Sequence, residues 1–123
     1  MANKIKTVSA TEKKQILFAT QPSMAVGAVM SATGAVTVDG KKIQKAGTPV
    51  AGDLTDRETE FTVAADDKAV GVLLHDVDVT NGAENATVLI FGFVDLNKLE
   101  NDVATQITTT IKTALAGKVT FLK

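Results

Sequence analysis

The strongest pattern in the chain is a pair of apolar segments between Ala69 and Leu99. They read AVGVLLHDVDVT and ATVLIFGFVDLNKL, and the polar turn NGAEN separates them. Two apolar runs joined by a short Asn/Gly turn are typical of a β-hairpin. Gly71 and Gly92 interrupt the runs, which predicts a bulge or a close approach by another backbone. We therefore predict a central hairpin that the rest of the chain covers or extends.

Shorter strands and turns are predicted upstream of this hairpin. Residues 24–30 (MAVGAVM) are apolar at successive positions, which predicts a strand buried on both faces. Asp39-Gly40 is a dipeptide favoured in two-residue turns and predicts a second hairpin. The other predicted elements are a turn at 31–34, the hairpin strands at 35–38 and 41–43, a polar connection at 51–60 and a strand at 61–64.

The hydrophobic period changes to that of a helix near residue 95. Asp95 or Asn97 could cap its start, and Gly117 is suited to the position just past its end. The β-branched residues 108–110 predict that the helix is broken or shortened there, and residues 118–122 predict a final strand. The apolar stripe consists of Leu96, Leu99, Val103, Ile107, Ile111 and Leu115.

Residues 1–23 are mostly polar and contain Pro22, which predicts a flexible N-terminal arm with a short strand in it. Residues 24–123 would then form one β-rich domain. The arm is either an ordinary frayed terminus or a segment that orders on a partner by adding a strand to a sheet edge. The candidate contact residues are Gln15, Ile16, Leu17, Phe18, Ala19, Thr20, Gln21 and Pro22. The predicted fold class is mainly β: a small barrel-like or sandwich-like domain with one C-terminal helical segment.

Composition narrows the classes of function. The 123 residues include 13 basic and 14 acidic side chains, so the formal charge is −1. Such a balance offers no basic footprint for nucleic acid or for a membrane surface. The absence of cysteine removes disulfides and thiolate chemistry, and the absence of Trp and Tyr limits stacking on bases. The apolar run at 16–19 ends at Thr20, so we expect a soluble protein without a targeting segment.

One cluster, at His75, Asp76 and Asp78, is a candidate for metal binding or acid–base chemistry. Alternation along a strand places His75 on one face and the two carboxylates on the other. We therefore expect a structural histidine and no metal site. Nucleophile elbows and phosphate-binding glycine loops are also absent from the sequence. We expect neither an enzyme nor a bound cofactor.

Lys68 lies in the short sequence Asp67-Lys68-Ala69 between two predicted strands. This sequence resembles the modified-lysine turn of lipoyl and biotinyl carrier domains, in which the lysine projects from a hairpin tip. The chain shows no second matching half, so we interpret Lys68 as a solvated turn residue.

The predicted strand at 86–94 carries more apolar side chains than one small domain can bury. Val88 and Ile90 face one way, while Leu89, Phe91 and Phe93 face the other. An exposed apolar surface usually marks a protein–protein contact. The alternative is a helix that covers one face of the strand.

Several segments resemble the head-decoration proteins of tailed bacteriophages, the lambda-type family and its relatives in phages of Gram-positive hosts. Residues 69–73 (AVGVL) resemble the family's Ala-Val-Gly-Ile-Leu strand, and the strand at 87–93 follows. Residues 43–50 (IQKAGTPV) and 71–79 (GVLLHDVDV) resemble segments of the Gram-positive-phage members. A helical segment closing on ALAG at 114–117, before the last strand, resembles the family's end. The chain differs in its N-terminal arm and in lacking Trp and Tyr.

The resemblance implies a structural virion protein on the outer surface of the expanded capsid, made in the host cytoplasm. Its partners would be the major capsid protein and further copies of itself, as homotrimers at three-fold or quasi-three-fold sites. Two alternatives stay open: the base domain of a head fibre or tail adhesin, and a lipoyl-like carrier domain that uses Lys68.

Overall fold

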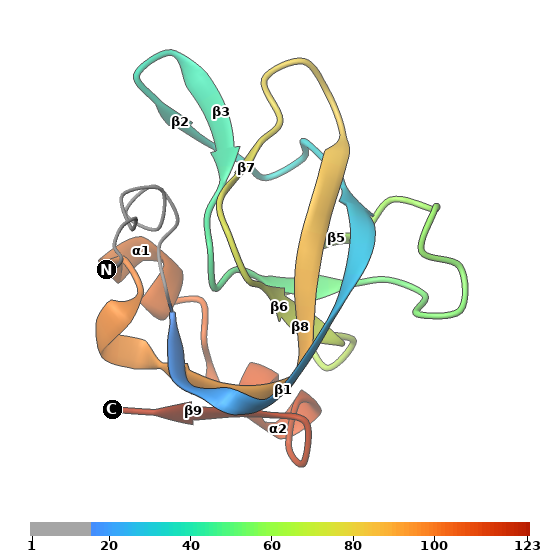
Figure 1. The fold of residues 1–123 in the computed structure, drawn as a ribbon. Coiled ribbons are helices and arrows are strands. Elements are labelled where there is room, and N and C mark those ends of the chain that lie inside the picture. Colours follow the sequence, from blue (N-terminus) through green and yellow to red (C-terminus); the bar gives the residue numbers. More distant parts are fainter. Residues whose placement is uncertain (1–15) are drawn as a thin grey trace, which may run out of the picture.

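The computed structural model describes the backbone of residues 16–123 and their side chains, except those of residues 18–22. Most of the regular structure is β, which confirms the predicted fold class (Figure 1). The strands are β1 (Leu17–Met30), β2 (Val36–Val38), β3 (Lys41–Gln44), β4 (Pro49–Ala51), β5 (Thr62–Val63), β6 (Gly71–Leu73), β7 (Val77–Asp78), β8 (Glu84–Asp95) and β9 (Val119–Leu122). The helical segments are η2 (Leu96–Lys98), α1 (Asn101–Ala104) and α2 (Thr109–Ala114).

The strands form two sheets that do not close into a barrel. The larger sheet has the order β1-β8-β6-β4-β5, and β9 pairs with β8 in parallel. The smaller sheet has the order β2-β3-β7. Its β2–β3 hairpin turns at Asp39-Gly40, as predicted, and both residues have positive φ (52° and 81°). Two consecutive residues with positive φ match the twist of a two-residue hairpin.

A long ribbon of β1 and β8 joins the two ends of the molecule. The two strands pair from Leu17 opposite Val94 to Met30 opposite Glu84. The predicted boundary between arm and domain, after residue 23, therefore falls inside β1. Ile16 and Leu17 are buried, and the amide of Asp95 donates to the carbonyl of Ile16 at 2.9 Å. Residues 1–15 lie outside the described part of the chain.

The predicted central hairpin is right in part, since its two segments pair in antiparallel fashion through β6 and β8, but its first strand is split between the two sheets. β6 pairs with β8, with Val72 opposite Leu89, but the chain bends at 74–76 and β7 pairs with β3 instead. The bend carries Val77 and Val79 into the core around β7. Both halves of the segment carry apolar side chains that must be buried, and for this reason the segment does not form one continuous strand.

Two clusters of buried side chains hold these layers together. The first lies between the larger sheet and the C-terminal helical segments and includes Leu89, while the second includes Val88, the residue before it on β8. The middle of β8 is therefore buried on both faces. The predicted two-sided burial of residues 24–30 is wrong, because the only buried residues of this segment, Ala28 and Met30, lie on the same face of β1.

The C-terminal apolar stripe is buried although its helix is broken, as the sequence predicted. The Asp95 side chain accepts the amide of Asn97 at 2.9 Å and caps η2. The Thr108 hydroxyl accepts the amide of Ile111 and caps α2, so the threonines begin a second helix. Gly117 has φ +80° just past α2. The stripe residues buried in the first cluster are Leu99, Val103, Ile107, Ile111 and Leu115.

Candidate interaction surface

Two large apolar side chains are exposed side by side where the β1–β8 ribbon bends. Met24 pairs with Phe91, and their exposed fractions are 57% and 41%. At this point β8 leaves β6, its partner at residues 88–89, and begins to pair with β9. Gly92, with φ +152°, and register shifts on both sides of Met24 form the bend (Figure 1). Irregular pairing here turns Met24 and Phe91 away from both cores.

Beyond the bend, β8 and β9 alternate between a core face and an outer face. Val94 and Val119 lie in the first cluster, and Phe121 packs against it. Phe93 and Leu122 alternate with these residues, are partly exposed, and belong to neither cluster. We call Met24, Phe91, Phe93 and Leu122 the outer apolar surface. The sequence predicted an exposed apolar surface, and the observed surface includes some residues that the prediction did not name.

The open edge of β1 is occupied at its C-terminal end. A guanidinium nitrogen (Nη1) of Arg57 donates to the carbonyl of Gly27 at 2.8 Å. The amide of Phe61 donates to the carbonyl of Val29 at 2.7 Å, and the amide of Ser31 donates to the carbonyl of Phe61 at 2.9 Å. Unpaired strand edges are templates for further strands. The polar connection that contains Arg57 therefore blocks the pairing of a further strand with this part of the edge.

A hollow of about 490 Å³ lies between that connection and the β1–β8 ribbon. Leu54, Arg57 and Glu58 line it on one side, and Gly27 and Asn85 line it on the other. Arg57 already donates to the carbonyl of Gly27. Of the described residues that line the hollow, only Arg57 and Glu58 are charged.

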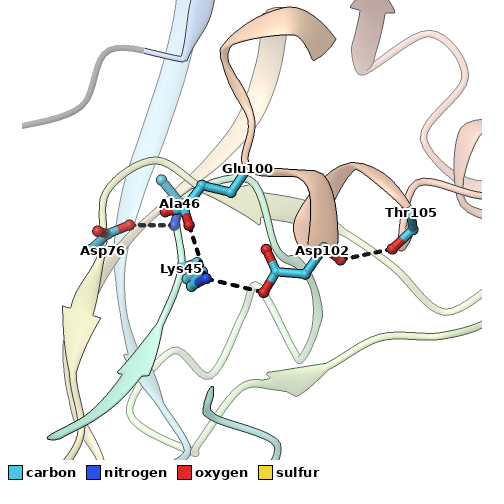
Figure 2. Close-up of polar contacts among 6 residues, drawn as sticks. All are labelled: Lys45, Ala46, Asp76, Glu100, Asp102 and Thr105. Atoms are coloured by element: carbon cyan, nitrogen blue, oxygen red, sulfur yellow. Dashed lines mark hydrogen bonds and ion pairs between the residues drawn. The ribbon is translucent and has the colours of Figure 1, made fainter. Parts of the chain in front are cut away.

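A three-way ionic contact ties the smaller sheet to the C-terminal segment. The ammonium of Lys45 donates to Glu100 at 2.9 Å and to Asp102 at 3.0 Å, at the start of α1 (Figure 2). Hydrogen bonds to Glu100 and then to Asp102 raise the pKa of Lys45. The hydrogen bond from Lys45 lowers the pKa of Asp102. Next to it, the amide of Ala46 donates to the Asp76 carboxylate at 2.7 Å. These contacts position α1 over the first cluster.

The His75, Asp76 and Asp78 cluster is not brought together around a shared site. Asp76 accepts the amide of Ala46, whereas Asp78 accepts the hydroxyl and amide of Thr80 at 2.6 and 3.0 Å. The hydrogen bond from the Thr80 hydroxyl lowers the pKa of Asp78. Within residues 16–123, no group of three or more His, Cys, Asp or Glu side chains is placed to hold a metal ion.

Lys68 does not lie on a hairpin tip of the carrier type. It is exposed in a turn between β5 and β6, where its amide donates to the Asp66 side chain at 3.0 Å. β5 and β6 both pair with β4 and not with each other. The lysine therefore joins two strands that lie on opposite sides of a third.

The proposed contact residues 15–22 fall into three groups. Gln15 lies outside the described residues, and Ile16 and Leu17 are buried in the first cluster. Residues 18–22 lie on β1, where the structure describes only their backbone. Ile16 and Leu17 thus hold β1 in place and are not available to a partner while the strand is folded.

Sequence reasoning missed the residues that shape the surface around β1. Arg57 carries no local signal, because its partner is the carbonyl of a residue 30 positions earlier in the chain. Met24 looks like a core residue, although Pro22, two residues before it, is a signal for irregular pairing. Lys45 carries no local signal either, because its two carboxylates, Glu100 and Asp102, lie 55 and 57 positions later in the chain.

Comparison with known proteins gives no family for this chain: no protein-family model matches it, and no curated protein is similar enough to match. Among the described residues, no helix has the length and apolar character needed to cross a membrane.

Proposed function

We propose that this protein decorates the outer surface of an expanded bacteriophage capsid and cements neighbouring major capsid subunits. The observation that carries the proposal is the outer apolar surface, which presents Met24 and Phe91 on a β-rich domain. Exposed apolar surface of this kind marks contact with other proteins. The class of partner is inferred from the resemblance to decoration proteins. The segments that carry this resemblance include β6, β8 and β9, three strands of the larger sheet.

Copies of the protein would sit as trimers at three-fold and quasi-three-fold positions of the shell. Each copy would bridge capsid subunits that the packed DNA pushes apart. Single contacts of this type can be weak, because a closed shell presents many sites at once and multivalency raises the overall strength of binding. A small domain with a modest apolar surface is suited to such a role.

The test of this function is co-sedimentation of the purified protein with expanded heads that lack it. Unexpanded precursor shells serve as the matched control, since they contain the same capsid protein in a different arrangement. We expect saturable binding to expanded heads and none to precursor shells. Binding to neither would refute decoration and would favour the base domain of a fibre or adhesin.

The N-terminal contact is tested by a deletion that leaves β1 complete. Ile16 is buried and Leu17 pairs with Val94, so removing residues 1–22 would damage the fold itself. Removing residues 1–14 keeps both of these residues. Because the candidate contact residues 15–22 are kept, we expect this shorter deletion to retain both the circular dichroism spectrum and head binding. Loss of head binding would assign a capsid contact to residues 1–14. Undiminished binding by the deleted protein would exclude a role for residues 1–14.

A further inference from the structure

We infer that Asn81 is a site of spontaneous deamidation, at which the backbone of the next residue converts the side-chain amide to a carboxylate. Asn81 is exposed in the turn between β7 and β8, and Gly82 follows it. The other asparagines of the chain precede residues that carry a side chain, and those that the structure describes lie on β8, in η2 and at the start of α1. They are Asn3, Asn85, Asn97 and Asn101.

The reaction needs only groups of this chain and water. The amide nitrogen of Gly82 bonds to the side-chain carbonyl carbon (Cγ) of Asn81, and its proton leaves with the side-chain nitrogen as ammonia. The product is a five-membered succinimide ring. Water then adds to one of the two ring carbonyls and breaks the bond from that carbon to nitrogen, which gives aspartate or isoaspartate. No electrons pass to or from another molecule, and asparagine is accordingly among the thermolabile residues.

The surroundings of the turn leave room for this ring to form. Within residues 16–123, no hydrogen bond holds the exposed side chain of Asn81. Gly82 has φ +121°, a conformation that residues with a side chain rarely adopt. A Cβ at Gly82 would have no heavy atom within 4 Å, so the turn has space in which to rearrange. Glycine therefore leaves the attacking nitrogen without the steric cover that a side chain would give.

The hydrogen bonds of the turn restrain the reaction. The amide of Gly82 donates to the carbonyl of Val79 at 3.0 Å, and this bond must open before the nitrogen attacks. The Thr80 hydroxyl donates to Asp78 at 2.6 Å and accepts the amide of Lys42 at 3.0 Å, which ties the turn to β3. From the net contribution of one hydrogen bond, we expect the folded protein to react roughly 2- to 12-fold more slowly than the unfolded chain.

Deamidation changes both the charge and the length of the backbone at this turn. One added carboxylate takes the formal net charge from −1 to −2. Isoaspartate also lengthens the main chain by one methylene group inside the turn that the bond from Gly82 to Val79 closes. The modified protein should therefore bind more strongly to an anion-exchange column than the unmodified protein.

Incubation in warm, mildly alkaline buffer, followed by peptide mapping with mass spectrometry, tests the inference. The variants are Asn81→Gln, whose longer side chain would need a six-membered ring, and the matched control Asn85→Gln, because Asn85 is also exposed and lies on β8. We expect the wild type and Asn85→Gln to gain the acidic form at residue 81, with one oxygen atom taken up from isotopically labelled water. Asn81→Gln should not gain this form in the same time. Thr80→Ala should react faster than the wild type, toward the rate of the chain in urea.

The inference is overturned if folded wild type stays unmodified while the same chain in urea reacts to completion at residue 81. Equal conversion at Asn85, Asn97 or Asn101 would also refute it, because exposure alone would then explain the reaction. Equal rates in Thr80→Ala and in the wild type would refute the restraint assigned to the turn. The reaction takes place in the isolated protein, so a failure of head binding would leave each of these results unchanged.

Discussion

Gly71 is the position where a single methyl group is expected to do most damage to the larger sheet. A Cβ at Gly71 would collide with the carbonyl oxygen of Leu89 and lie 2.8 Å from a methyl group of Val88. A backbone oxygen cannot rotate away, so β6 would have to move from β8 by on the order of 1 Å. That movement would loosen the pairing of Val72 with Leu89.

The expected loss of stability follows from two opposing terms. Overpacking of a tight site costs about 1–3 kcal/mol, and a weakened hydrogen bond costs about 1 kcal/mol more. Replacing glycine by alanine also stabilises the protein by about 0.4–1 kcal/mol, because it lowers the conformational entropy of the unfolded chain. We expect Gly71→Ala to lower the free energy of unfolding by about 2–3 kcal/mol. For a chain of this length, that corresponds to a fall in Tm of about 6–12 °C.

Gly27→Ala is the matched control for this measurement. Gly27 also lies in a strand that pairs with β8, but a Cβ there would have no heavy atom within 4 Å. We expect its Tm to stay the same or to rise slightly, because only the unfolded-state term remains. Thermal melts followed by circular dichroism compare the two variants with the wild type. Equal Tm values for Gly71→Ala and the wild type would refute the argument from close approach.

Two further substitutions test the polar contacts. Lys45→Met removes the ionic contact with Asp102 and should lower stability by about 0.5–1 kcal/mol at pH 7, measured by urea unfolding. The lowered pKa of Asp102 stabilises the fold above the ordinary carboxyl value of 3.8, and this contribution is lost as the pH falls through the folded value. The gap between wild type and Lys45→Met should therefore narrow in acid, and a gap independent of pH would contradict this assignment. Gln44→Met should cost about 1–3 kcal/mol, because buried Gln44 donates to the carbonyls of Ser31 and Thr33 at 2.8 and 3.0 Å. An unchanged urea midpoint would show that water replaces these bonds.

Local signals in the sequence predicted the local features of the fold. Asp39-Gly40 forms a hairpin turn because its conformation depends on the two residues themselves. Gly71 marks a close approach because only a residue without Cβ fits beside the Leu89 carbonyl. Asp95 caps η2 with its own side chain. In each case the signal and the structure lie within one element or one contact.

Features that depend on distant partners could not be predicted from the pattern. An apolar run is compatible with one long strand or with two strands in different sheets, and the pairing of β7 with β3 decides between them. Met24 and Ile16 are both apolar, yet Met24 is exposed and Ile16 is buried. The hydrophobicity of a side chain determines how much free energy its burial would gain. The bend in the β1–β8 ribbon determines which of the two side chains is buried. The candidate surface at Met24 and Phe91 therefore became visible only in the structure.

The broken C-terminal helix shows how a distant constraint acts on a local pattern. One continuous helix could carry the whole stripe from Leu96 to Leu115, and it would be about 30 Å long. However, β9 is parallel to β8 and starts opposite Gly92, so the chain that leaves β8 at Asp95 must return by only about 10 Å along the strand. A continuous helix of that length would end beyond that point, because it keeps one direction along its whole axis. Three short helical segments bury the same stripe and still bring Val119 to its partner. The stripe therefore determines which side chains are buried, the parallel register favours a broken helix, and the Thr108 cap sets where α2 begins.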